Sequence, residues 1–217
     1  PTDRRPAIAA TKVQAQPGVL RQPAGSGPAE ILQRADSAWR QGRGEEALRL
    51  LSDLLREHPE QGGARLLLSR ILQQAGRDAE AGRVLAEGLE LDPGEPLLAM
   101  ARAETLARRG ESRLALEVLQ RARDRGAADP RFLAFVASLS QRLGEHSRAV
   151  EAYRRALAAR PDAAVWWLGL GISLQALGED AGAVRAYRRA LAGGGLKDTL
   201  RDFARGRLAR LERRSSG

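Results

Sequence analysis

The 217-residue sequence contains no cysteine and one methionine, and aromatic residues make up only 4% of it. Without cysteine, a disulfide scaffold and a thiolate metal site are excluded. Alanine, leucine, arginine and glutamate are much more abundant than β-branched residues, which favours helices over sheets. We therefore expect an all-α fold.

Long apolar runs are also missing. The longest one covers about residues 163–174 and includes two glycines, whereas a bilayer span needs roughly 18–20 apolar residues. The first residue is a proline, and residues 1–27 lack the apolar core of a signal peptide. We expect a piece of a longer protein, with any targeting segment upstream.

Basic residues outnumber acidic ones by 36 to 27, and much of the excess lies at the two ends of the chain. Residues 1–27 contain four basic residues and one acidic residue, and residues 198–217 contain six and three. Nucleic-acid surfaces gather basic residues on one face, with aromatic side chains that stack on bases. Because the excess lies at the ends instead, we expect no nucleic-acid partner.

A period of 34 residues runs through most of the chain. It is marked by glycines, namely Gly42, Gly76, Gly110, Gly144 and Gly178. Five residues after each glycine comes an alanine, namely Ala47, Ala81, Ala115, Ala149 and Ala183. Four residues after each alanine comes a large residue, namely Leu51, Leu85, Leu119, Tyr153 and Tyr187. This period predicts five repeated units, over residues 28–61, 62–95, 96–129, 130–163 and 164–197.

Each unit is predicted to be two helices joined by a tight turn. The glycine permits the left-handed backbone that ends the first helix. Small residues such as Ala35 and Ala47 let the two helices approach closely, and Leu51 fills the space between them. Proline removes an amide donor, so it ends the second helix at Pro59, Pro93 and Pro161. At the first position of a helix that donor is not needed, as at Pro96 and Pro130.

The last unit resembles the tetratricopeptide repeat, through Trp167, Leu170, Gly171, Leu174, Gly178, Ala183, Tyr187 and Ala190. The resemblance implies a right-handed superhelical solenoid in which the first helix of each unit lines a concave face that holds partner peptides. Departures from the pattern are Arg65, Gly88, Ala127 and Gly195. Residues 198–214, with Leu200, Phe203, Leu208 and Leu211 as an apolar stripe, are predicted to form a capping helix. Residues 1–27 are predicted to be a disordered linker containing proline and glycine, and residues 215–217 a tail.

The groove residues follow from the register of this resemblance. The second, fifth, ninth and twelfth positions of the units nominate Leu32, Asp36, Trp39, Leu66, Arg70, Gln73, Leu97, Met100, Glu104, Arg131, Ser138, Gln141, Leu168, Ile172 and Gln175. This set lacks the Lys, Asn and Arg side chains with which chaperone-binding members of the family hold a peptide carboxylate. A co-chaperone role is therefore disfavoured. We expect Trp167 in the core, and Trp39 at a contact surface.

Catalytic and metal-binding patterns are missing from the sequence. The two histidines, His58 and His146, are 88 residues apart, and neither has a second ligand at metal-binding spacing. Gly193-Gly194-Gly195 is not followed by the Lys-Ser/Thr of a phosphate-binding loop. No Gly-x-Ser-x-Gly element of a serine hydrolase occurs. We expect no enzyme, no metal and no cofactor.

A second resemblance covers about residues 150–211. The Trp166 to Leu174 stretch, the Ala186 to Leu191 stretch and Gly194-Gly195-Leu196 are similar to the C-terminal region of the MshN family. That family belongs to the MSHA system, a type IV pilus assembly apparatus of Gram-negative bacteria. The resemblance implies a scaffold whose partners are other pilus-assembly components. It also implies one inner-membrane span upstream and a periplasmic repeat domain.

Three alternatives remain open. The repeats could be a targeting or regulatory region of a larger enzyme whose catalytic domain lies upstream. They could be cytoplasmic, because a lack of cysteine suits the periplasm and the cytoplasm equally. They could also bind a polyanion through the arginine-rich C-terminal segment, which contains Arg205, Arg207, Arg210, Arg213 and Arg214.

Overall fold

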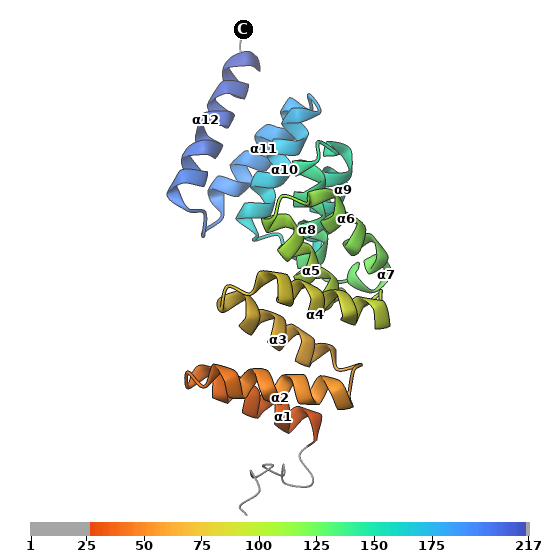
Figure 1. The fold of residues 1–217 in the computed structure, drawn as a ribbon. Helices are drawn as coiled ribbons and strands as arrows, with labels where there is room; N and C mark the ends of the chain where they lie inside the picture. The colour runs from red at the N-terminus through yellow and green to blue at the C-terminus, as the bar shows by residue number, and fades with distance from the viewer. Residues whose placement is uncertain (1–26, 216–217) are drawn as a thin grey trace, which may run out of the picture.

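The computed structural model describes residues 27–215, which form twelve α-helices and no β-strand. The predictions for residues 1–26 and 216–217 lie outside this range. Figure 1 shows the helices stacked in chain order into an elongated solenoid, from α1 and α2 at one end to α12 at the other. The prediction of an all-α repeat solenoid is confirmed.

Five helical pairs make up most of the solenoid. The first helices of the units are α1 (Pro28–Arg40), α3 (Gly62–Gln74), α5 (Pro96–Arg108), α8 (Pro130–Arg142) and α10 (Ala164–Ala176). The second helices are α2 (Gly44–Glu57), α4 (Asp78–Leu91), α6 (Ser112–Arg121), α9 (His146–Ala159) and α11 (Asp180–Ala192). Two further helices are α7 (Arg123–Gly126) and α12 (Asp198–Ser215).

Glycine turns join the two helices of each unit. All five glycines of the 34-residue period have a positive φ, between 73° and 83°. Glycine adopts this left-handed conformation without the steric cost that a Cβ atom imposes. In the first turn, the amide of Arg43 donates to the carbonyl of Ala38 at 2.9 Å, so the end of the helix keeps its hydrogen bonds.

The third unit differs from the prediction of two helices. Its second helix ends at Arg121, and the single turn α7 follows. No proline closes this unit, because Ala127 stands at the closing position. Gly126 lies directly against the buried ring of Phe132, where a Cβ atom would be 2.6 Å from the ring. The absence of a side chain at Gly126 therefore lets α7 pack onto α8.

Small and large residues fill the space between the helices as the sequence predicts. Ala35, Ala47 and Leu51 are completely buried in the first unit. At the C-terminal end, α12 packs on α11 and buries Leu211 and Ala204, whereas Phe203 remains partly exposed under the guanidinium of Arg207. The last unit thus has its apolar face covered by a helix that is polar on its outer side.

The packing of the helices decides which face is concave. Each first helix lies against the next one, from α1 and α3 through to α8 and α10. Among the described helices, no two successive second helices make comparably close contact. The second helices therefore splay apart while the first helices crowd together. This geometry makes the first helices the inner side of the solenoid.

Candidate functional site

A hollow of about 580 Å³ lies between α1 and α3 on the inner side. It is lined by four of the predicted groove residues, Leu32, Asp36, Leu66 and Arg70, together with Gln33, Arg40, Gly63 and Leu67. Every lining residue comes from a first helix. Two successive first helices meet here at Gly63, which lies close to the Leu32 side chain, and so they leave an open depression above them.

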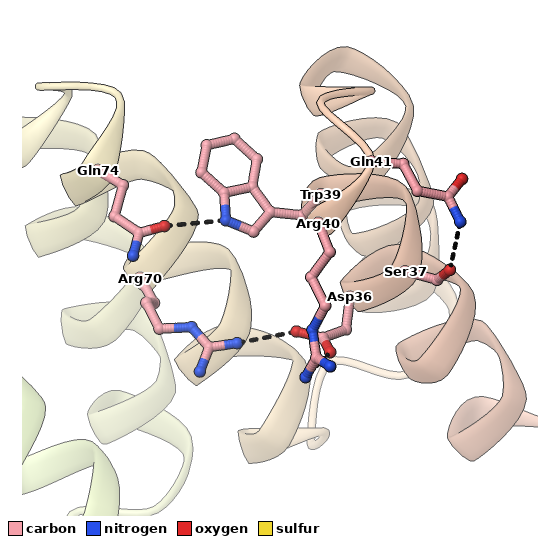
Figure 2. Close-up of polar contacts among 7 residues, drawn as sticks. All are labelled: Asp36, Ser37, Trp39, Arg40, Gln41, Arg70 and Gln74. Atoms are coloured by element: carbon pink, nitrogen blue, oxygen red, sulfur yellow. Dashed lines mark hydrogen bonds and ion pairs between the residues drawn. The ribbon is translucent and has the colours of Figure 1, made fainter.

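Polar side chains form the rim of this hollow (Figure 2). The carboxylate of Asp36 accepts from two arginines, with Arg70 Nη2 at 3.0 Å from Oδ1 and Arg40 Nη2 at 2.6 Å from Oδ2. On the same edge, Trp39 Nε1 donates to Gln74 Oε1 at 2.9 Å. Ion pairs this exposed contribute little to stability, about 0–1 kcal/mol. Their side chains therefore remain available to a partner.

A second hollow, of about 400 Å³, continues the first one along the array. The two share Gly63 and Leu66, so together they form one depression across the first three units. We call it the first-helix trough. The second hollow adds two strongly exposed leucines, Leu91 and Leu97, and three acidic residues, Glu60, Asp92 and Glu95. The Glu95 carboxylate also accepts from the amide of Leu98 at 2.6 Å and so caps α5.

All three nominated glutamines form hydrogen bonds within or between the units. Gln73 Nε2 donates to Thr105 Oγ1 at 3.1 Å, and Gln141 Nε2 donates to Ser173 Oγ at 2.8 Å. Both bonds join the first helices of successive units. Gln175 Oε1 accepts from the Tyr187 hydroxyl at 2.9 Å. These glutamines therefore hold the array together.

The remaining nominated residues are spread along α5, α8 and α10. Leu168 is only 4% exposed and belongs to the core of the last two units. Arg131 is exposed and pairs with Asp129 at 3.0 Å, a contact that lowers the pKa of the Asp129 carboxyl. Ser138 donates to a carbonyl of its own helix, that of Phe135. Glu104 is exposed, and Met100 and Ile172 are half-buried. The two hollows around units one to three contain five of the nominated residues, Leu32, Asp36, Leu66, Arg70 and Leu97.

The tryptophans occupy intermediate positions. Trp167 is only partly buried, and its Nε1 donates to the carbonyl of Pro161 at 2.8 Å. Trp166 packs near Ala134, with the Arg160 guanidinium 5.3 Å above its ring. Trp39 is half-buried and bonded to its neighbour unit. The expectation that Trp167 is a core residue is thus met only in part, because one side of its indole lines an open hollow.

Sequence reasoning missed four residues that line the inner hollow. Gln33 and Leu67 stand at the sixth position of their units, and Arg40 at the thirteenth. Helical geometry places these positions one turn away from the second and ninth positions, so the 34-residue period could have predicted them as groove residues. Gly63 does stand at a counted position, but it has no side chain to suggest a contact.

Other kinds of site find little support in the described part of the chain. Residues 27–215 contain no group of three or more His, Asp or Glu side chains arranged to hold a metal ion. Within the same range, every helix is too short or too polar to cross a bilayer.

Two family models of the tetratricopeptide repeat match the sequence, over residues 38–105 and 137–196, which together are more than half of the chain. The chain is a tetratricopeptide repeat protein. No curated protein matches its sequence. Solved tetratricopeptide-like arrays share its fold, and at the identities below that likeness concerns the fold alone.

YrrB, described as a protein with an unusual peptide-binding site, has a TM-score of 0.68 at 15% identity, and the match covers 83% of this chain and 93% of that one. PilF of Pseudomonas aeruginosa has a TM-score of 0.67 at 17% identity, covering 85% of this chain and 88% of that one. MamA from Desulfovibrio magneticus RS-1 has a TM-score of 0.64 at 20% identity, covering 77% and 96%.

Proposed function

We propose that this tetratricopeptide repeat protein is a non-catalytic scaffold that holds a protein or peptide partner in the first-helix trough. The observation that carries the proposal is the continuity of the trough. Two hollows share Gly63 and Leu66, and together their lining comes from three successive units. A length of extended or helical polypeptide needs such a shape, whereas a small molecule needs an enclosed cavity.

The residues of the trough suit a polypeptide ligand. Exposed leucines such as Leu97 offer apolar contact, and the charged groups along the rim, such as Asp36 and Arg70, fix orientation. Interfaces between proteins combine an apolar centre with a polar rim in this way. The partner would cover leucines that are now in water.

We further propose a place in type IV pilus assembly, in a system like MSHA. The similarity of residues 150–211 to the MshN family supports this placement, and the fold shared with PilF of Pseudomonas aeruginosa is compatible with it. In such a system the repeats would lie in the periplasm, attached to a single inner-membrane span upstream. The partner would be another component of the assembly apparatus.

Two leucines of the third unit provide a matched test. Leu97 on α5 is 49% exposed inside the trough, and Leu114 on α6 is 48% exposed outside it. We would immobilise the whole chain and its Leu97→Glu and Leu114→Glu variants, and then identify by mass spectrometry the proteins retained from detergent-solubilised envelope. Leu97→Glu should reduce recovery of the partner more than about fivefold, the effect of losing roughly 1 kcal/mol of binding energy. Leu114→Glu should leave recovery unchanged.

The outcomes separate the two parts of the proposal. Equal recovery on both variants would contradict the trough as the binding site. Selective loss of proteins unrelated to pili would keep the trough and refute the pilus assignment. Circular dichroism of both variants should match that of the parent, because each leucine is half in water already.

A further inference from the structure

The outer side of the solenoid carries a second recessed surface that the proposed scaffold function does not use. A hollow of about 370 Å³ opens between the second helices α9 and α11 and has the first helix α10 as its floor. A neighbouring hollow of about 430 Å³ opens between α11 and α12. Both are lined by Arg185 of α11, so they are adjacent. We call the pair the second-helix trough.

The floor of this trough is apolar and recessed. In the first hollow it includes Trp167, Leu157, Leu170 and Leu174, and in the second it includes Leu211. All of these except Trp167 are buried, so they lie below the general surface. A floor of this kind accepts inserted side chains, whereas a flat surface does not.

The rim of the trough is basic. It contains four arginines, Arg154, Arg185, Arg188 and Arg214, against one aspartate, Asp180. Arg154 and Arg214 reach the carboxylates of Glu179 and Asp180 only at 3.7 and 3.8 Å, and their side chains are 61% and 73% exposed. Arg188 is held more closely, with its Nη2 at 2.7 Å from Glu212 Oε1, and is 62% exposed. Such pairs exchange partners at small energetic cost. Among the described residues, Arg185 forms no ion pair, which leaves its guanidinium available.

A related hollow lies between the second helices of units two and three. It has a volume of about 310 Å³, and its lining combines apolar residues, including Leu89 and Val118, with Arg102, Arg121 and Glu90. The balance of charge also changes along the array. Residues 130–215 contain 16 basic and 8 acidic residues, whereas residues 28–95 contain 9 basic and 13 acidic residues. The basic excess is therefore concentrated in the C-terminal part of the array, where the second-helix trough lies.

We propose that the second-helix trough binds an acidic segment of a partner protein, with apolar side chains seated between α9, α10 and α11 and carboxylates on the arginine rim. Charge complementarity identifies the occupant, since a guanidinium group forms bidentate hydrogen bonds with a carboxylate. A membrane surface requires apolar side chains that protrude, and those of the floor are recessed. Proteins that bind single-stranded nucleic acid stack the bases on several exposed aromatic rings, and the floor has one tryptophan.

Fluorescence provides the test. The probe is a fluorescein-labelled peptide of aspartate, glutamate and two leucines, titrated with the whole chain and followed by anisotropy. A peptide with lysine in place of every acidic residue is the control ligand. Arg185→Glu should weaken binding of the acidic peptide about tenfold, the loss expected when one charge-assisted contact becomes repulsive. Arg155→Glu makes the same change of charge on α9 outside the trough and should alter binding less than about twofold.

Several results would overturn the proposal. These are failure of the acidic peptide to bind, equal binding of the lysine peptide, and equal loss in Arg185→Glu and Arg155→Glu. Vesicles of anionic phospholipid and single-stranded DNA are further arms, and tighter binding of either than of the peptide would assign the surface to that ligand instead. Leu97→Glu should leave peptide binding intact, so this proposal and the proposed scaffold function fail independently.

Discussion

An arginine lies inside the solenoid at position 65, where its side chain is 7% exposed. Its Nε and Nη2 donate to the carbonyl of Pro59 at 3.2 and 3.1 Å, and its Nη1 donates to that of Val84 at 3.3 Å. In the last unit, Trp167 makes the corresponding bond to Pro161. A buried guanidinium needs these partners, because each unmet donor costs about 1–3 kcal/mol or more.

Gly88 lies directly against the Arg65 side chain and leaves the space that this side chain occupies. A Cβ atom there would be 2.6 Å from Cδ of Arg65 and 2.9 Å from Cδ1 of Leu98. Gly88→Ala should therefore cost about 1–3 kcal/mol from overpacking, reduced by the roughly 1 kcal/mol by which alanine favours a helix. In an Arg65→Ala background only the contact with Leu98 remains, so the same change should cost less than in the parent. Urea unfolding followed by Trp39 fluorescence measures both steps, and equal effects of Gly88→Ala in the two backgrounds would contradict the coupling.

At the scale of a helix, α10 shows how two glycines organise three helices. A Cβ atom at Gly169 would be 2.4 Å from the ring of Tyr153 on α9, and one at Gly171 would be 2.8 Å from the ring of Tyr187 on α11. The two tyrosine rings therefore rest on the backbone of α10 from two directions. Both are buried, and burial raises the pKa of each hydroxyl to about 12.

This burial predicts a loss of stability at alkaline pH. The unfolded pKa of tyrosine is about 10, so the folded state holds its phenolic protons more tightly between pH 10 and 12. The stabilisation is complete below pH 10 and disappears as the pH rises through that window. Between pH 9 and 11 the free energy of unfolding should fall by roughly 1 kcal/mol for each tyrosine. Urea unfolding of the parent and of a Tyr153→Phe, Tyr187→Phe variant measures this, and an equal slope in both would refute it.

Helices and turns were predictable from sequence because each depends on a few local residues. The glycines of the 34-residue period and the prolines at helix ends act within one turn of the chain, and the structure places a left-handed residue at each predicted glycine. The single turn α7 was not predictable, because it depends on contact between Gly126 and Phe132. Likewise, Arg65 and Gly88 stood out as separate departures, and only their contact shows that each permits the other.

The sequence predicts which helix face forms the groove better than it predicts which residues of that face are accessible. The register places the nominated residues on first helices, and four of them line the inner hollow. Whether a side chain on that face is available depends on the next unit. Gln141 lies on a first helix as predicted, but its side-chain amide donates a hydrogen bond to Ser173, and Leu168 is buried by its neighbours. A repeat pattern contains no information about such contacts, because they differ from one junction to the next.

For the molecule as a whole, the core is divided into separate clusters. One cluster joins α1 to α4, from Ile31 to Ala81. Others begin at Ala99 on α5 and continue through α8 to Leu211 on α12. Among the described residues, no cluster contains fully buried side chains from both unit two and unit three, although the half-buried Leu89 of α4 packs against the cluster that begins at Ala99. In a linear array, stability is the sum of units and of interfaces between neighbours.

We therefore expect units one and two to unfold before the rest. Trp39 reports on the first cluster, and Trp166 and Trp167 report on the last one. Fluorescence of a Trp166→Phe, Trp167→Phe variant should change at lower urea concentration than that of a Trp39→Phe variant, because two units bury less apolar surface than three units and a cap. Adding Arg65→Ala should lower the first transition and leave the second in place. Coincident transitions in every variant would show one cooperative unit instead.

The first-helix trough connects this division to function, because Leu66 lies on one side of the junction between units two and three and Leu97 on the other. A partner that contacts both leucines binds only when the two parts are folded and correctly placed. Binding to the native state stabilises it by mass action. The partner should therefore raise the Trp39 transition toward the C-terminal one, and Leu97→Glu should abolish that shift. A partner that raised the Trp39 transition equally in the Leu97→Glu variant would bind within units one and two alone.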